Sequence, residues 1–164
     1  IDMVIDSAAH VLSEAFIKQL HATLKSGTSN SRQDWFAVGD YKKLPNEVGG
    51  MDTAQPEEVA SQMKKLLSEY NANKEKSFDD LLDFHYRFER IHPFQDGNGR
   101  VGRLVLFKEC LRNNIVPFII DDSEKMFYYR GLSEWETEKG YLTDTCLDGQ
   151  DTFKELMALF DIRP

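Results

Sequence analysis

The chain has 164 residues, and its 20 Lys plus Arg against 28 Asp plus Glu give a formal net charge of −8. This length corresponds to one domain, and a composition that is 41% hydrophobic, with 11 Phe, supports a core without disulfide or metal staples and excludes global disorder. Because the chain is acidic and its basic residues are scattered, we expect no nucleic-acid partner. No apolar run approaches the ~20 residues of a membrane span, so we expect no membrane partner either.

The two cysteines, Cys110 and Cys146, are too few and too far apart for a disulfide framework. We expect both to be buried thiols, which is typical of a reducing compartment and favours the cytoplasm. The chain starts at Ile1 with no initiator methionine and no signal-peptide pattern. We therefore expect residues 1–164 to be a single domain excised from a longer chain.

The first third of the chain predicts one helix, a loop and a hairpin. Apolar residues recur at helical spacing over residues 8–24, with Ser7 as a candidate N-cap and Gly27 just beyond the end. Residues 26–34 form a polar, turn-forming cluster, which predicts a loop. Over residues 35–50, apolar residues are interrupted by three turn-forming pairs, and this pattern favours a short β-hairpin.

The rest of the chain predicts helices. Pro56 suits a first helical turn, Ser77 a helix N-cap, and Pro93 the end of the helix that Ser77 starts. Another helix starts at Asn98 or Gly99 and is so densely apolar that we expect it to run through the middle of the domain. The predicted helices cover residues 56–70, 78–91, 98–112, 123–132, where Ser123 is the candidate cap, and 152–160. The fold class is mainly α, a helical bundle with one short β-hairpin.

The loop between the two central helices carries the residues expected of a phosphate site. A helix N-terminus offers unpaired backbone N–H groups and a partial positive charge, and Gly97 and Gly99 leave room for an anion to reach them. Arg100 and Arg103 lie three residues apart, hence on one helix face, and each guanidinium can bind phosphate oxygens in a bidentate way. The pattern predicts a polyphosphate ligand.

Two further residues of this loop add chemistry. Asp96 offers hard oxygen ligands to a Mg²⁺ ion, or Mn²⁺, that bridges phosphate oxygens. His92 follows the preceding helix, and a neutral imidazole there can accept the proton of an attacking hydroxyl. Taken singly, His92 can cap a helix, Asp96 can be a turn residue, and the two arginines can be a solvated face. Their concentration within twelve residues favours a catalytic site.

Two other readings of the same residues are weaker. Residues 97–102 match the dinucleotide-binding pattern G-x-G-x-x-G, with Asp121 and Asp122 near the distance expected for a ribose-binding acid, but a helix and a His-Pro loop precede them instead of a buried strand. A metal site formed by His85, Glu89 and His92 lacks the H-E-x-x-H spacing and any cysteine ligand.

Residues 92–103, which read HPFQDGNGRVGR, resemble the full signature of Fic domains, H-P-F-x-[D/E]-G-N-G-R-x-x-R, at every position. The resemblance extends to residues 38–50 and 103–120, and it covers roughly residues 16–132. It implies a Fic-type helical bundle whose hairpin forms a flap. The reaction that it implies is AMPylation: transfer of AMP from ATP to a Ser, Thr or Tyr hydroxyl of a target protein, with release of pyrophosphate.

Carried over by position, the resemblance makes His92 the general base, Asp96 the Mg²⁺ ligand and Phe94 the core anchor of the loop. It assigns nucleotide binding to Phe94 as well and to the remaining motif residues, where Gly97, Asn98 and Gly99 form the anion cradle and Arg100 and Arg103 clamp the outer phosphates. The flap that would hold the target segment comprises Tyr41, Lys42, Lys43, Leu44, Pro45 and Asn46. From the residues alone, Tyr128 and Tyr129 can line a pocket for the nucleotide base, but a core or surface role suits them at least as well, so they are left out of the predicted site.

The resemblance leaves alternatives open. Some Fic proteins transfer other phosphoryl groups or remove AMP, and a non-catalytic nucleotide sensor is also compatible with the site. Many members are held off by an inhibitory helix of pattern [S/T]-x-x-x-E-[G/N] whose glutamate pairs with the second arginine of the signature. The nearest match starts at Thr53, but Glu58 replaces the final Gly or Asn. We therefore expect the inhibitory segment to lie outside these residues, upstream or on an antitoxin chain.

Overall fold

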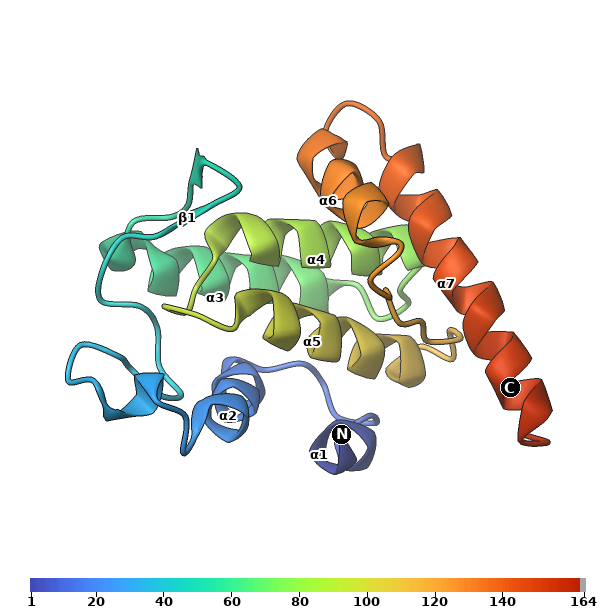
Figure 1. Ribbon diagram of the computed structural model, residues 1–164, viewed down its shortest axis with the longest axis horizontal. Helices are drawn as coiled ribbons and strands as arrows, with labels where there is room; N and C mark the ends of the chain where they lie inside the picture. Colours follow the sequence, from blue (N-terminus) through green and yellow to red (C-terminus); the bar gives the residue numbers. More distant parts are fainter. Residues whose placement is uncertain (163–164) are drawn as a thin grey trace.

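The computed structural model describes residues 1–162, with residue 51 described by its backbone alone, and it is mainly helical, as predicted (Figure 1). The helices are α1 (Asp2–Asp6), α2 (Glu14–Lys25), α3 (Pro56–Ala72), α4 (Phe78–Ile91), α5 (Asn98–Arg112), α6 (Lys125–Glu134) and α7 (Gly140–Leu159). A 3-10 turn, η1 (Asn30–Arg32), and a hairpin of β1 (Glu47–Val48) and β2 (Met51–Asp52) complete the elements.

The helices α3, α4 and α5 form the centre of the molecule (Figure 1). Helices α1 and α2 pack on α5 at one side, and α6 packs on α7, which contacts α4, at the other. One hydrophobic cluster joins α2, α3, α4 and α5, and a second joins α4 and α5 to α6 and α7. Helix α5 contributes Val101 and Val105 to the first cluster and Leu106 and Cys110 to the second, which confirms its predicted central place.

The helix boundaries around the central loop agree with the sequence prediction. The Ser77 hydroxyl accepts a hydrogen bond from the backbone N–H of Asp80 and starts α4, and Pro93 follows its last turn. Helix α5 starts at Asn98, directly after Gly97, whose φ of +88° is accessible to glycine at little cost. The loop of residues 92–97 is therefore fixed between two buried helices.

The N-terminal prediction was wrong in its boundary. Helix α2 starts at Glu14 rather than near Ala8, because the Ser13 hydroxyl accepts a hydrogen bond from Phe16 N at 3.2 Å and takes the cap position expected of Ser7. The preceding residues 2–6 form the separate short helix α1, which buries Val4.

The hairpin lies closer to the C-terminus of its predicted region than expected. Strands β1 and β2 pair antiparallel, Glu47 with Asp52 and Val48 with Met51, around a turn of Gly49 and Gly50. Both glycines have positive φ, +57° and +75°, which a two-residue hairpin turn with the preferred twist requires. Residues 35–46 are irregular instead.

The two C-terminal helices also differ from prediction. Helix α6 starts at Lys125 and is not capped by Ser123, because the Asp121 carboxylate accepts the N–H groups of Ser123 and Glu124. Helix α7 starts at Gly140, twelve residues before its predicted start. Its first half includes Gly149, which packs against Phe118. Small and polar residues in this half weaken the apolar periodicity, so the sequence did not indicate a helix there.

Two predictions from composition can be compared directly. Cys110 and Cys146 are free and buried, as expected. Within residues 1–162, none of the helices combines the length and the apolar character needed to cross a membrane.

Candidate active site

His92 occupies a strained position at the end of α4. Its φ of +51° is left-handed, a conformation that costs a non-glycine residue roughly 1–2 kcal/mol. The conformation is held by a hydrogen bond from its backbone N–H to the Phe88 carbonyl at 3.0 Å. Strain of this kind concentrates at functional sites.

The imidazole of His92 has a defined tautomer. Its Nδ1 lies 3.2 Å from the carbonyl oxygen of Glu89, which can only accept a hydrogen bond, so Nδ1 carries the proton and Nε2 is the basic nitrogen. Burial lowers the pKa of His92 below its ordinary value, the Glu89 carbonyl raises it in part, and the positive charge of Lys42 lowers it further. The side chain is therefore a neutral base at pH 7.

Asn98 and Phe94 fix the loop rather than face an anion. The Asn98 side chain is buried, accepts the N–H of Phe94 at 2.7 Å and donates to the Phe94 carbonyl at 2.7 Å. Phe94 is fully buried and its ring stacks on His21 with centroids 4.0 Å apart. Phe94 thus has the place of the core anchor, and in the part of the chain that the structure describes it does not line the cavity of the site.

Asp96 lies among positively charged and donor groups from three elements. The buried Lys25 of α2 contacts its Oδ2, Asn30 of η1 donates to the same oxygen at 3.4 Å, and Arg100 lies 3.7 Å from it. The hydrogen bond from Lys25 is the largest cause that lowers the pKa of Asp96. The lowered pKa keeps the Asp96 carboxylate anionic, and the three contacts hold its Oδ2 in place.

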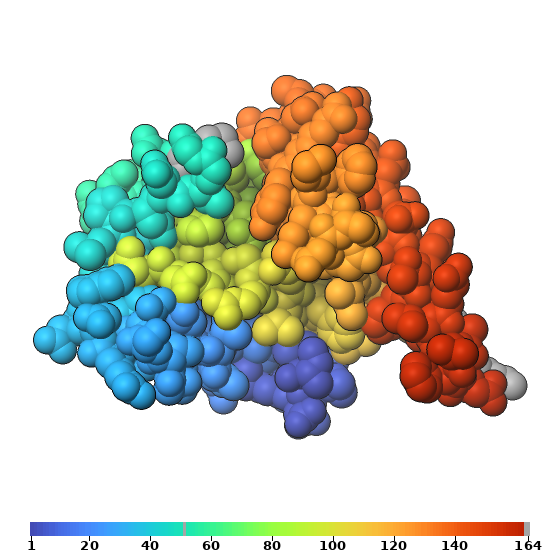
Figure 2. All heavy atoms as spheres, viewed as in Figure 1, coloured from blue at the N-terminus to red at the C-terminus, as the bar shows by residue number. Residues whose placement is uncertain are grey.

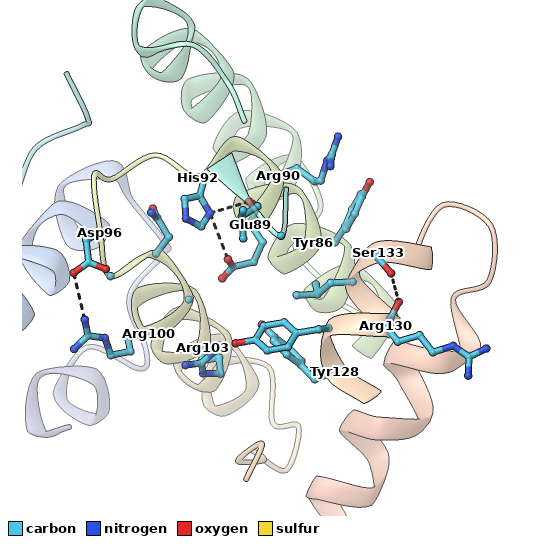
Figure 3. A pocket seen from close by; sticks show the side chains of 17 residues that line it. Tyr86, Glu89, Arg90, His92, Asp96, Arg100, Arg103, Tyr128, Arg130 and Ser133 are labelled. Atoms are coloured by element: carbon cyan, nitrogen blue, oxygen red, sulfur yellow. Dashed lines mark hydrogen bonds and ion pairs between the residues drawn. The ribbon is translucent and has the colours of Figure 1, made fainter. Parts of the chain in front are cut away.

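The two arginines of the motif lie on one face of α5, a turn apart, as predicted (Figure 3). Arg103 lies with its guanidinium carbon 5.9 Å from the centroid of the Tyr128 ring, and it approaches Gly99 so closely that a Cβ there would lie 3.3 Å from its Nη1. Among residues 1–162, no carboxylate forms an ion pair with Arg103. Gly99 therefore keeps the space between the helix N-terminus and Arg103 open.

One cavity of about 770 Å³ collects these groups. Figure 2 shows it as a hollow between the hairpin and α6, with atoms of the motif at its floor. Seven predicted site residues line it, namely His92, Asp96, Gly97, Asn98, Gly99, Arg100 and Arg103. Val48 and Gly49 of the hairpin line its rim.

The predicted flap residues have mixed surroundings. Lys43, Leu44 and Pro45 are exposed, and Asn46 is half-buried. The ring of Tyr41 lies against Phe94, and Lys42 is 3% exposed. Within the described residues none of these side chains lines the cavity, whose rim on this side is the hairpin itself.

Several lining residues were missed by the sequence prediction. Tyr128 is buried and Tyr129 exposed, and both line the cavity, together with Tyr86, Arg90, Arg130, Leu132 and Ser133. The sequence left open whether the two tyrosines line a base pocket or belong to the core or surface, and the structure places both at the cavity. Glu89 carried the available signal, since it lies on α4 three residues before His92, which caps the end of that helix.

Glu89 is the most unusual of the missed residues. Its side chain is 11% exposed, its Oε2 lies 3.9 Å from Nδ1 of His92, and its Oε1 has no hydrogen-bond partner among the described residues. Burial raises the pKa of Glu89 to about 7, and the charge of Arg103 opposes the rise. A carboxyl group that titrates near neutral pH thus faces the same cavity as the base (Figure 3).

The two alternative readings of the motif find no support in this geometry. The G-x-G-x-x-G stretch follows helix α4 and a loop, and the strands found in residues 1–162 are antiparallel. The His85 Nε2 lies 2.6 Å from the Tyr128 hydroxyl in the interior, and no group of three or more metal-ligating side chains occurs among the described residues.

Comparisons with known proteins agree with the geometry. The chain is 27% identical over 135 residues to a protein adenylyltransferase Fic of Drosophila mojavensis, which covers 77% of this chain and 27% of that protein. It is 32% identical over 88 residues to protein adenylyltransferase fic-1 of Caenorhabditis elegans, covering 52% of this chain and 17% of that protein. The chain thus spans about a quarter, or less, of the length of these curated relatives.

Solved structures show the same fold. A Fic domain containing signaling protein from Bacteroides thetaiotaomicron has a TM-score of 0.78 at 25% identity, covering 96% of this chain and 66% of that one. Fic-1 of Caenorhabditis elegans has a TM-score of 0.71 at 17% identity, covering 98% and 50%. The sequence model described as Fic/DOC family matches residues 11–109, more than half of the chain, and the protein therefore belongs to the Fic/DOC family.

Proposed function

We propose that the chain is a protein adenylyltransferase that moves AMP from ATP to a hydroxyl side chain of a target protein. The observation that carries the proposal is one cavity that holds both a neutral histidine base and an anion site, formed by the N-terminus of α5 with Arg100 and Arg103. The names of the matched relatives, protein adenylyltransferase, support ATP as the nucleotide and a protein as the acceptor.

The proposed reaction gives each of these groups a role. Nε2 of His92 takes the proton of the target hydroxyl, and the hydroxyl oxygen forms a bond to the α-phosphorus of ATP. The bond from that phosphorus to the bridging oxygen of the β-phosphate breaks, and pyrophosphate leaves. The N–H groups at the start of α5 and the charges of Arg100 and Arg103 stabilise the negative charge that develops on the phosphate oxygens.

Asp96 is the residue that would hold a Mg²⁺ ion. Mg²⁺ in phosphate sites takes one or two protein carboxylates together with substrate phosphates and water, and an anionic, fixed carboxylate at the edge of the anion cradle fits that donor set. When bound, the ion would neutralise phosphate charge. The contacts of Lys25 and Arg100 keep the carboxylate anionic and hold it at the edge of the cavity.

The hairpin would position the target. Its two strands are short, Glu47 and Val48 form an edge, and Val48 and Gly49 line the rim of the cavity beside His92. Pairing of an extended target segment along such an edge needs backbone hydrogen bonds and little specific sequence.

The test is transfer of label from ATP labelled on the α-phosphate, in a lysate and in the purified protein, with ATP labelled on the γ-phosphate in parallel. We expect α-label on protein, its loss in His92→Ala, and its retention in His10→Ala, which removes an exposed histidine outside the cavity. Transfer of the γ-label alone would replace AMP transfer by a kinase-like reaction. Nucleotide binding without either transfer would replace the enzyme by a nucleotide sensor.

A further inference from the structure

Lys42 is a buried lysine without an acidic partner. Its side chain is 3% exposed, and no carboxylate lies within ion-pair distance of its Nζ in the described part of the chain. Burial lowers the pKa of Lys42 to about 8, so the ammonium form still prevails at neutral pH. Charged groups are rarely buried in this way unless their hydrogen-bond donors are satisfied.

The three donors of the Lys42 ammonium contact neutral oxygens from the two ends of the hairpin and from the end of α4. Nζ donates to Oδ1 of Asn46 at 2.6 Å, to Oγ1 of Thr53 at 2.7 Å and to the Ile91 carbonyl at 3.4 Å. Asn46 and Thr53 directly precede and follow the hairpin, and the Thr53 hydroxyl donates to Asn46 Oδ1 at 2.6 Å. Ile91 directly precedes His92. The ammonium thus joins both ends of the hairpin to the end of α4.

Backbone hydrogen bonds extend the same junction. The N–H of Lys42 donates to the Pro93 carbonyl at 2.9 Å, and Nδ2 of Asn46 donates to the Phe94 carbonyl at 2.9 Å. Leu44 and the Gln95 side chain exchange two further bonds, of 3.1 and 3.3 Å. The residues on both sides of His92 are therefore hydrogen-bonded to the segment that leads into the hairpin.

We propose that Lys42 is a positioning residue. Its buried ammonium joins Asn46 and Thr53, which together form the neck of the hairpin, to the loop that carries His92. The hairpin edge and the proposed base therefore keep one fixed relative position. A hairpin of two-residue strands has little stability of its own. Its place beside His92 therefore depends on this neck. Thr53, which starts the nearest match to the inhibitory pattern, is 8% exposed and belongs to this cluster.

The test compares Lys42→Met with the wild type by amide hydrogen exchange, followed residue by residue. Methionine keeps an unbranched apolar side chain as far as the ε position and removes the ammonium with its three donors. We expect exchange at residues 42 and 44 and in the hairpin to become at least tenfold faster, while the amides in the middle of α3 and α4 change less than twofold. Lys64→Met, the same change at an exposed lysine of α3, is expected to leave all of these rates unchanged.

Two further variants keep the test decisive. Lys42→Arg retains charge and donors and is expected to recover much of the lost protection. If Lys42→Met does not fold, Thr53→Val removes one acceptor of the cluster and is expected to speed exchange in the hairpin in the same direction. A folded Lys42→Met protein with unchanged hairpin exchange would overturn the proposal.

A kinetic readout deepens the proposed function and rests on it. Once a target is identified, Lys42→Met is expected to raise the KM for the target about tenfold while the Kd for ATP changes less than twofold. An equal loss of ATP affinity would contradict a positioning role. The exchange experiment requires no activity, so its result separates failure of this inference from failure of the proposed AMP transfer.

Discussion

At the scale of single residues, the proposed role of His92 as a base rests on three local features: a left-handed backbone, a carbonyl acceptor at Nδ1 and burial. Burial disfavours the imidazolium and lowers the pKa of His92 below its ordinary value of 6.5. We therefore expect the acid limb of the pH dependence of kcat/KM to lie below pH 6.5, since the base is lost only when the pH falls through this lowered pKa.

Two measurements check this prediction. The pH dependence of AMP transfer gives the limb, and NMR titration of the imidazole gives the pKa of His92 without requiring activity. A titration midpoint of His92 at or above its ordinary value of 6.5 would contradict the prediction.

Glu89 predicts a dependence of folding stability on pH. A rise of its pKa from 4.5 to about 7 means that the folded protein binds a proton at Glu89 more tightly than the unfolded chain does. This proton binding contributes to the free energy of unfolding in full below about pH 4.5, and the contribution is lost as the pH rises through 7. The loss corresponds to roughly 3 kcal/mol. Glu89→Gln removes the ionisation and is expected to raise the free energy of unfolding by about 1–3 kcal/mol at pH 8.

Urea denaturation at pH 8 and pH 5 measures this effect. The gain in Glu89→Gln is expected to shrink strongly at pH 5, where the carboxyl group is mostly protonated. Glu57→Gln, at an exposed glutamate in the first turn of α3, is the matched control and should change little at either pH. A gain of the same size at both pH values would show that ionisation of Glu89 does not cause it.

At the scale of elements, the contact of α4 with α5 depends on Gly102. A Cβ at this position would lie 2.5 Å from Oε1 of Glu89 and 3.1 Å from atoms of His85 and Phe88. Overpacking of this kind typically costs 1–3 kcal/mol, more than the roughly 0.5–1 kcal/mol that alanine gains over glycine within a helix. Gly102→Ala is therefore expected to lower the free energy of unfolding by about 1–2 kcal/mol.

Denaturant titration of Gly102→Ala beside Gly99→Ala checks this. At Gly99 the nearest atom is the mobile end of the Arg103 side chain, at 3.3 Å, so we expect a change within about 0.5 kcal/mol. If Gly102→Ala were as stable as the wild type, the two helices would have to separate more easily than their packing indicates.

The sequence predicted some elements well because their signals are local. Ser77, Pro93 and Gly97 act on their immediate neighbours, so the bounds of α4 and the start of α5 agree with the structure. Ser7 and Ser123 failed as caps because a second local acceptor, Ser13 or Asp121, took the N–H groups. The choice between two adequate caps depends on tertiary packing, which the periodicity of one segment does not contain.

In the candidate site, too, local signals could be read from the sequence and contacts made by tertiary packing could not. Seven residues of the motif lie at one cavity because they fall within twelve residues of sequence. Tyr128 and Tyr129 enter the cavity only because α6 packs back over α4 and α5, and no spacing within α6 distinguishes that packing from an ordinary core contact. Lys42 is similar, since an exposed-type residue in a polar loop gives no sign that its side chain turns inward.

At the scale of the whole molecule, the two hydrophobic clusters share α4 and α5, the helices that flank the motif. A ligand at the loop between them should therefore stabilise the entire fold and not one end of it. Binding to the folded state alone adds about 2.7 kcal/mol at a concentration of 100 times Kd. For a domain of 164 residues this corresponds to a rise in Tm of roughly 5–10 °C.

This stabilisation should depend on the phosphate contacts, because the chain as a whole carries a net charge of −8 and provides no general attraction for an anion. Arg103→Gln is expected to weaken ATP binding at least tenfold, as the loss of charge-assisted hydrogen bonds implies, and to remove about half of the Tm rise at the same ATP concentration. Adenosine, which lacks the phosphates, should stabilise both proteins equally. Arg87→Gln, whose arginine pairs with Glu69 outside the cavity, should respond to ATP as the wild type does. Equal ATP responses of Arg103→Gln and the wild type would mean that the phosphates do not lie at the N-terminus of α5.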